Sequence, residues 1–205
     1  DLMGISVPNV TLKVKETKLK SNGPLLITHW GMSGPAILRL SAWGARELFD
    51  KNYQFTLQVN FLHEEVFDDV LVQLNELKLE HAKKTVVKKS PFDLTTRLWE
   101  QLVLASEINA DAKWADLTKK QLVNLTNQLT NAEFKVNGKS TFKDEFVTAG
   151  GIDLKEIDFK TMQSKLFKNL YFTGEIMNVD AITGGFNFQN AWTSGFIAAQ
   201  AIANK

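Results

Sequence analysis

The spacing of apolar residues changes twice along the chain, and this change restricts the fold more than any other feature. In one run, every second residue is apolar: Tyr53, Phe55, Leu57, Val59 and Phe61. That period is typical of a strand with one buried face. From Glu64 to about Ala132 the apolar residues recur at intervals of three and four, as in amphipathic helices. Alternation returns after Ala132, so the order predicts an α+β protein with a helical insert between strands.

Local signals predict the elements around this insert. The alternating residues at 10–14 indicate a strand, "SNGP" at 21–24 indicates a turn, and "LLITH" after it indicates a second strand. The segment 35–49 is predicted to be a helix with Pro35 in its first turn.

Three helices are expected within the insert, from the apolar spacing around Val70, Leu102 and Leu125. Asp93 and Asp116 precede two of them and are the expected N-caps. The linker before the second helix ends in Ser90–Pro91, which favours a helix boundary there.

The C-terminal third returns to strand signals and then closes with one helix. Asn137–Gly138 stands between two alternating runs and predicts a hairpin. "NLYFTGE" at 169–175 is expected to be a strand, and a helix is predicted from Phe186 to Ala203. This last pair fits the earlier sheet poorly and resembles part of an α/β layer whose other strands are missing here.

Composition excludes several classes of function. The chain has 205 residues, 44% of them hydrophobic and 23% charged, with a net charge of +1. That charge provides no global field for nucleic acid, and no apolar run reaches the roughly 18 residues of a transmembrane helix. Cysteine is absent, which excludes disulfides, thiolate metal sites and dithiol redox chemistry. The start of the chain lacks signal-peptide features, so we expect a cytoplasmic protein with no nucleic-acid or membrane partner.

A histidine and a lysine cluster in the sequence do not require a metal site or a nucleic-acid site to explain them. His29 has no second histidine or carboxylate at metal-ligand spacing, so no metal is expected. The basic cluster of the insert lacks interleaved aromatic residues and follows acidic ones, as in a solvated helix end. Its members are Lys83, Lys84, Lys88 and Lys89.

The start of the closing helix is the best candidate for a ligand site. A helix N-terminus presents unpaired N–H groups and a partial positive charge. Gly184 and Gly185 place no Cβ between that backbone and a ligand. Small residues are predicted on one helical face, which lets the helix lie close to a sheet or a flat ring: Ala191, Ser194, Gly195, Ala198 and, with them, Ile202. The spacing alone is equally compatible with a glycine-rich helix start packed in a core.

Longer motifs add a family resemblance. "LLITHWGMSGPAILRLS" at 25–41 and the segment 147–200, with "VTAGG", "YFTGE" and "ITGGFNFQ", resemble the BaiN-like, or aminoacetone-oxidase-like, FAD-binding flavoproteins. The resemblance covers nearly the whole chain and is weakest in the helical middle. It implies a β-barrel-like domain at 1–63 and 132–165, a helical insert at 64–131, and the C-terminal strand and helix of a split FAD-binding α/β domain at 166–205.

The same resemblance implies a cofactor and its contacts. FAD would be bound by the parent protein, with NAD(P)H as a candidate electron donor and a small organic molecule as substrate. The residues that match the flavin-contacting motif are Gly174, Glu175, Asp180, Gly184, Gly185, Phe186, Asn187 and Gln189. Phe186 replaces a usual tyrosine, and Asn178 and Ala181 also depart from the pattern. Thr148, Gly150 and Gly151 are expected on the substrate side, although a glycine turn at a hairpin end would explain them equally well.

The resemblance also predicts what the chain lacks. No G-x-G-x-x-G fingerprint is present, so the adenine and most of the pyrophosphate would lose their main site. We therefore expect a fragment of an FAD-dependent oxidoreductase that is inactive by itself. No catalytic residue is identified, and the oligomeric state is not predicted. The alternative is a non-catalytic interaction module that docks a partner through the helical insert.

Overall fold

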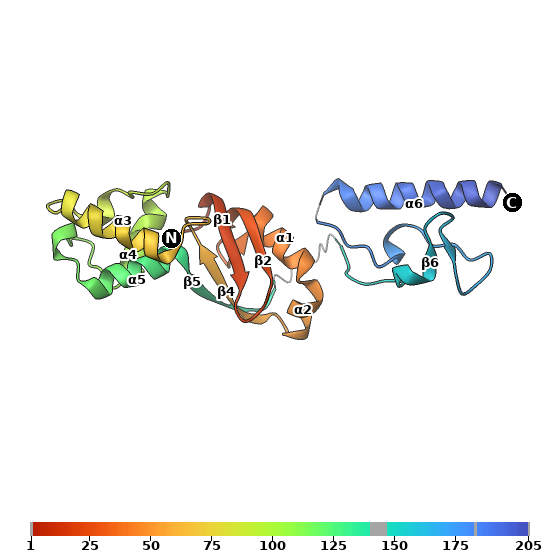
Figure 1. The fold of residues 1–205 in the computed structure, drawn as a ribbon, viewed down its shortest axis with the longest axis horizontal. Helices are drawn as coiled ribbons and strands as arrows, with labels where there is room; N and C mark the ends of the chain where they lie inside the picture. Colours follow the sequence, from red (N-terminus) through yellow and green to blue (C-terminus); the bar gives the residue numbers. More distant parts are fainter. Residues whose placement is uncertain (1, 140–146, 183, 205) are drawn as a thin grey trace. The chain divides into compact units, whose positions relative to one another are not determined.

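The computed structural model describes residues 2–139, 147–182 and 184–204 (Figure 1). The chain divides into two compact units, 1–40 with 51–138 and 41–50 with 139–205, and each is described by itself. Strands and helices are mixed in the manner expected from the two periodicities, so the α+β class is confirmed.

The first unit contains a curled five-stranded antiparallel sheet with the order β3-β2-β1-β4-β5. Every second residue of the central strands points into the core, and Val10, Leu12 and Val59 have no exposed surface. The strands are β1 (Ser6–Val14), β2 (Lys20–Ile27), β3 (Met32–Ser33), β4 (Gln54–Asn60) and β5 (Ala132–Asn137).

The turn predicted at 21–24 is wrong, because these residues belong to β2. The β1–β2 register shifts between Val7 and Val10, which pair with Leu25 and Gly23. Pro24 falls in this irregularity, where its missing N–H interrupts no ladder bond. The chain instead reverses at 15–19, where Glu16 adopts a φ of 63°.

The predicted helix at 35–49 forms as two pieces, α1 (Pro35–Trp43) and α2 (Ala45–Asp50). Gly34 precedes α1 with a φ of 100°, which favours glycine. A Cβ there would lie 2.9 Å from the Pro24 carbonyl oxygen and 3.0 Å from the Leu26 nitrogen. The glycine of the "SGPA" motif therefore lets the chain pass close to β2 before the helix begins.

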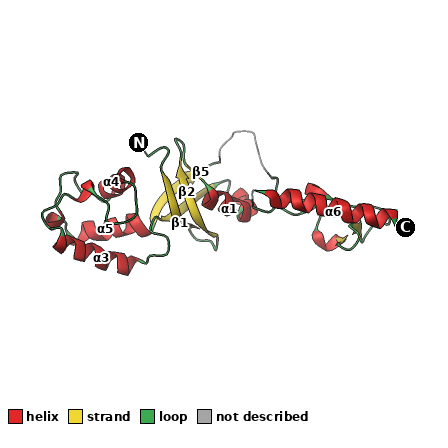
Figure 2. Cartoon of the chain, turned by 90° about the horizontal axis from the view of Figure 1, so that it is seen from above, coloured by secondary structure: helices red, strands yellow, loops and turns green. Residues whose placement is uncertain are grey.

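Three helices follow β4 and lie together beside the sheet (Figure 2). They are α3 (Phe67–Glu80), α4 (Thr96–Ala105) and α5 (Lys119–Thr130), with short 3-10 turns η1 (Val86–Lys88) and η2 (Trp114–Asp116). Their core is centred on Trp99, which stacks on Trp114 at 6.4 Å and donates a 2.8 Å hydrogen bond to the Val86 carbonyl. All three lie within the predicted insert, whose exact boundaries stay a prediction.

The N-caps predicted for these helices are wrong. Thr95, not Asp93, caps α4 by accepting from the Leu98 N–H. Thr118, not Asp116, caps α5 and forms a capping box with Gln121. In both cases the cap lies two residues after the expected aspartate, because the chain stays extended or in a 3-10 turn until the threonine.

Thr118→Ala is expected to destabilise the first unit by about 0.5–2 kcal/mol, the usual cost of removing an N-cap side chain. Asp116→Ala is the matched control, because Asp116 is exposed and caps nothing in α5. It should change stability by less than about 0.5 kcal/mol. Chemical denaturation compares the two, and equal destabilisation by both would contradict the assignment of the cap.

Besides α2 and the end of α1, the second unit contains α6 (Gly185–Ala203), two short strands and two 3-10 turns. These are β6 (Ile157–Asp158), β7 (Gln163–Ser164), η3 (Leu154–Glu156) and η4 (Gly174–Ile176). A small core of Ile157, Met162, Met177 and Ala198 holds them together.

Two expectations for this region have different outcomes. The prediction of a strand at 169–175 is wrong. Within the described residues this segment makes one isolated bridge, between Tyr171 and Gln163, and continues into η4. Extended backbone needs a neighbouring strand to form a ladder, and only this bridge is available to it there. The hairpin at Asn137–Gly138 begins with β5, but its second strand would fall at 140–146, outside the described residues.

Neither a membrane span nor a metal cluster is found in the described ranges. No helix among these residues is both long enough and apolar enough to cross a membrane. The same residues contain no group of three or more histidine, aspartate or glutamate side chains placed to hold a metal ion.

Candidate functional site

The N-terminus of α6 is open. Gly184 is its N-cap residue, with a φ of 145°, and no side chain of a described residue accepts a hydrogen bond from the first amides. A Cβ built on Gly185 would meet nothing within 4 Å, and one on Gly184 would meet only the Phe186 ring, at 4.0 Å. Both glycines are exposed. The positive end of a 19-residue helix is therefore accessible to a ligand.

Small side chains line the inner face of α6, as predicted. Ser194 and Ala198 are buried, and a Cβ on Gly174 would lie 3.8 Å from that of Ala191. The Ser194 hydroxyl accepts a 3.0 Å hydrogen bond from the Gly174 N–H, which joins η4 to the helix. Ile202, placed on this face by its spacing, is instead 53% exposed.

Asn187 positions the loop before the helix. Its side-chain oxygen accepts from the Ala181 N–H at 2.9 Å, and its amide donates to the Ala181 carbonyl at 3.2 Å. Since the side chain is buried with both polar atoms engaged, it fixes Ala181 against the first turn of α6. Gln189 is exposed and donates to Thr193 Oγ1. Whether either residue contacts a flavin stays a prediction.

The other predicted site residues are distributed around this helix start. Gly174 opens η4 with a φ of 72°, and Glu175 beside it is exposed. Asp180 is partly buried in the loop that Asn187 holds. The Ser194 bridge was not predicted, although a hydroxyl one turn from Ala191 on the same helical face is a signal that could have suggested it.

The predicted substrate-side glycines differ in their surroundings. Gly150 and Gly151 both have a positive φ, of 116° and 122°. A Cβ on Gly150 would meet nothing within 4 Å, whereas one on Gly151 would lie 2.5 Å from the Ile176 carbonyl oxygen. Gly151 therefore has a packing role, where Ile152 donates to the same carbonyl. A substrate-side role for these glycines and for the exposed Thr148 stays a prediction.

The opposite side of α6 carries large apolar side chains, here named the aromatic face. Phe188 and Trp192 stack on each other with ring centroids 6.1 Å apart. More than half of each residue in this set is exposed: Phe186, Phe188, Trp192 and Phe196. Exposed apolar patches of this kind mark interaction surfaces.

These features suit a large planar anion that meets α6 by one edge. The uncapped amides supply donors and partial positive charge, the two glycines leave space, and the fixed loop presents further backbone groups. The described residues accordingly fit the flavin end of FAD better than its adenosine end, for which the sequence has no glycine fingerprint.

A curled antiparallel sheet with helices inserted between β4 and β5 defines a barrel-and-helical-domain protein. The chain belongs to the HI0933-like family: residues 1–147 match the model of the HI0933-like protein barrel and H2TH domain. This family is FAD-associated, in agreement with the flavoprotein resemblance of the sequence.

Three curated relatives are similar over nearly the whole chain. Ribosomal RNA dihydrouridine synthase of Escherichia coli K12 is 32% identical over 199 residues, which cover 97% of this chain and 46% of that protein. The protein of the same name in Haemophilus influenzae is 32% identical, over 100% of this chain and 48% of its own length. The 3-dehydro-bile acid delta(4,6)-reductase of Clostridium scindens is 29% identical, over 93% and 46%. The chain spans about half the length of these relatives.

Proposed function

We propose that this chain is the substrate-side and C-terminal flavin-contacting part of an FAD-dependent oxidoreductase. The observation that carries the proposal is the open start of α6, where no described side chain caps the amides after Gly184 and a Cβ built on Gly185 meets nothing within 4 Å. When bound, FAD supplies hydride-transfer chemistry, with NAD(P)H as the proposed electron donor. The helix N-terminus stabilises the negative charge that the ring carries when reduced.

The proposed reaction is reduction of a carbon–carbon double bond. The names of the relatives describe the formation of dihydrouridine and a delta(4,6)-reductase activity. In both reactions a carbon–carbon double bond of the precursor becomes a single bond. One hydride and one proton are added for each double bond that is reduced. In both precursors the double bond is conjugated to a carbonyl group, which accepts the developing negative charge.

Two substrate classes are compatible with this chemistry. The family resemblance implies a small organic molecule and the net charge favours no nucleic acid, and the bile acid reductase name agrees with the small-molecule class. Two of the three relatives described above, however, are named for ribosomal RNA. We therefore propose a uridine within RNA as the first candidate substrate, acted on in the cytoplasm, and a small conjugated ketone as the second.

The remainder of the flavin domain is proposed to cover the aromatic face of α6. Four large aromatic side chains are exposed there, while the small face is already packed against η4. The relatives are about twice as long as this chain, which leaves room for the strands that the isolated 169–175 segment lacks. The chain alone is thus proposed to be inactive.

The alternative is an interaction module that uses the helical insert without catalysis. It requires the glycine-rich helix start to be buried packing. Gly184 and Gly185 are both exposed, which favours the flavin proposal.

Extending the polypeptide on the N-terminal side of Asp1 tests the proposal. The extended protein is expected to purify yellow, with the visible absorbance of a flavin, and to oxidise NAD(P)H when a conjugated carbonyl substrate is added. The 205-residue chain is the matched control and should purify colourless. An extended protein that is colourless and takes up no added FAD would overturn the proposal.

A further inference from the structure

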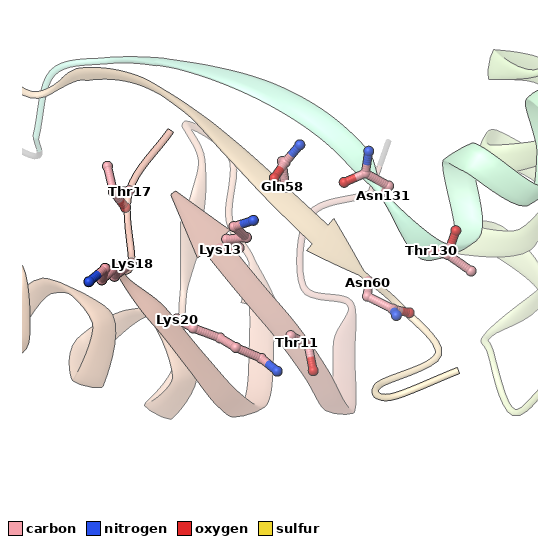
Figure 3. A pocket seen from close by; sticks show the side chains of 9 residues that line it. All are labelled: Thr11, Lys13, Thr17, Lys18, Lys20, Gln58, Asn60, Thr130 and Asn131. Carbon is pink, nitrogen blue, oxygen red and sulfur yellow. The ribbon is translucent and has the colours of Figure 1, made fainter. Parts of the chain in front are cut away.

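A separate feature of the first unit is a polar hollow on the solvent-facing side of the sheet, with a volume of about 540 Å³. Figure 3 shows its side chains on β1 and β4, on the turn before β2 and the first residue of β2, and at the junction of α5 with β5. The lining residues are Thr11, Lys13, Thr17, Lys18, Lys20, Gln58, Asn60, Thr130 and Asn131.

Positive charge is concentrated in this polar hollow. Three of the nine lining residues are lysines, and none is acidic. Lys13 and Lys20 are direct partners in the β1–β2 register, and both are exposed. Like charges directly opposite each other destabilise a sheet, so this pair has an energetic cost that a bound anion would remove.

The nearby carboxylates do not cancel this charge. Glu133 on β5 is bound by Lys15, whose Nζ lies 2.9 Å from Oε1, and by the Gln58 amide at 2.9 Å. The Lys15 hydrogen bond, followed by that of Gln58, holds the pKa of the Glu133 carboxyl below its usual value. Glu16 in the 15–19 turn is exposed and does not line the hollow.

Most of the uncharged lining groups already have partners within the chain. The Thr17 and Thr130 hydroxyls donate to backbone carbonyls, and the Asn60 and Gln58 amides donate to the Glu65 carbonyl and the Glu133 carboxylate. The three lysines are therefore the main groups for an anion, and lysine ammonium groups are usual partners of phosphate oxygens in nucleic-acid complexes. No aromatic side chain lines the polar hollow, so it has no platform for base stacking.

We propose that this polar hollow binds the phosphate backbone of an RNA substrate and so positions the RNA on the sheet. The inference rests on the proposed function, since it assumes that the reduced base is a uridine within RNA. The proposal differs from the expectation, drawn from the sequence, that the protein has no nucleic-acid partner. That expectation used the net charge of +1, which is a sum over the whole chain and does not reveal a local basic surface.

The test compares two triple variants that remove the same charge. Lys13→Gln/Lys18→Gln/Lys20→Gln changes the polar hollow, and Lys83→Gln/Lys84→Gln/Lys89→Gln changes exposed lysines of the helical insert. Both are made in the N-terminally extended protein. Binding of a fluorescein-labelled hairpin RNA with unpaired uridines is followed by anisotropy over a range of salt concentrations.

The hollow variant is expected to bind the hairpin 10- to 100-fold more weakly at about 0.1 M salt, with the salt slope reduced by about 2. This follows from about 0.7 units of slope for each phosphate that the variant no longer neutralises. The insert variant should keep both the affinity and the slope of the parent. Equal weakening in both variants, or parent-like binding by the hollow variant, overturns the proposal, as does equal lysine-dependent binding to phosphatidylserine vesicles.

The FAD content of the same preparations separates this inference from the proposed function. A protein that carries FAD but binds RNA independently of the hollow keeps the oxidoreductase proposal and rejects the RNA surface. If the protein carries no FAD and only the hollow variant loses RNA binding, the RNA surface is kept and the oxidoreductase proposal is rejected.

Discussion

Gly151→Ala is expected to destabilise the second unit by about 2–5 kcal/mol, the sum of two effects. At a φ of 122° an alanine is strained by about 1–2 kcal/mol. Its Cβ would also lie 2.5 Å from the Ile176 carbonyl oxygen and 2.6 Å from the Met177 carbonyl carbon. These are backbone atoms that cannot rotate away, so the chain must shift at a further cost of about 1–3 kcal/mol.

Gly150→Ala is the matched control for this substitution. Its φ of 116° imposes nearly the same backbone strain, but a Cβ there meets nothing within 4 Å. It should cost only the strain of about 1–2 kcal/mol.

Hydrogen exchange locates the damage caused by Gly151→Ala. Ile152 donates to the Ile176 carbonyl at 2.9 Å, and Asn178 donates to the Ile152 carbonyl at 3.0 Å. Both amides should exchange faster in Gly151→Ala than in Gly150→Ala. Identical melting temperatures and exchange rates in the two variants would contradict this prediction. They would show that the backbone at 176–177 can move away from a Cβ at position 151.

Gly185→Val is expected to remove stoichiometric FAD from the N-terminally extended protein without unfolding it. Because nothing lies within 4 Å of an added Cβ, the fold can accept the side chain. The same space is where the flavin edge is proposed to approach the amides of α6. Overpacking of about 1–3 kcal/mol corresponds to a rise of about 5- to 150-fold in the Kd of FAD.

Ala105→Val provides the control in another helix. Ala105 is exposed at the end of α4, so this substitution adds the same branched side chain away from the proposed site and from the aromatic face of α6. The measurements are FAD absorbance after purification and titration of the apoprotein with FAD. Retention of FAD by Gly185→Val at the level of Ala105→Val would count against the site, whatever the catalytic activity.

Periodicity predicted the elements that bury one face against their own neighbours. The alternation at 53–61 became β4, and the three- and four-residue spacing became α3, α4 and α5. These predictions succeeded because the burial that stabilises each element repeats along its own sequence. The small inner face of α6 was predictable for the same reason.

The predictions that failed depended on partners distant in the sequence. "SNGP" has the composition of a turn, yet pairing with β1 keeps it extended, and the register irregularity at Pro24 makes this possible. The aromatic segment 169–175 has strand propensity but only one bridging partner among the described residues. Aspartate is as good an N-cap as threonine, so only the path of the chain placed the caps at Thr95 and Thr118.

The sequence by itself determined the α+β class, the inserted helices and the glycine-rich start of the last helix, because each depends on local spacing or residue type. Tertiary structure alone decided that Gly151 lies against the 176–177 backbone, that Asn187 holds the loop before α6, and that Lys13 faces Lys20. The physical reason is that van der Waals contact, hydrogen bonding and charge repulsion act over a few ångströms in space. Folding brings together residues that the sequence separates.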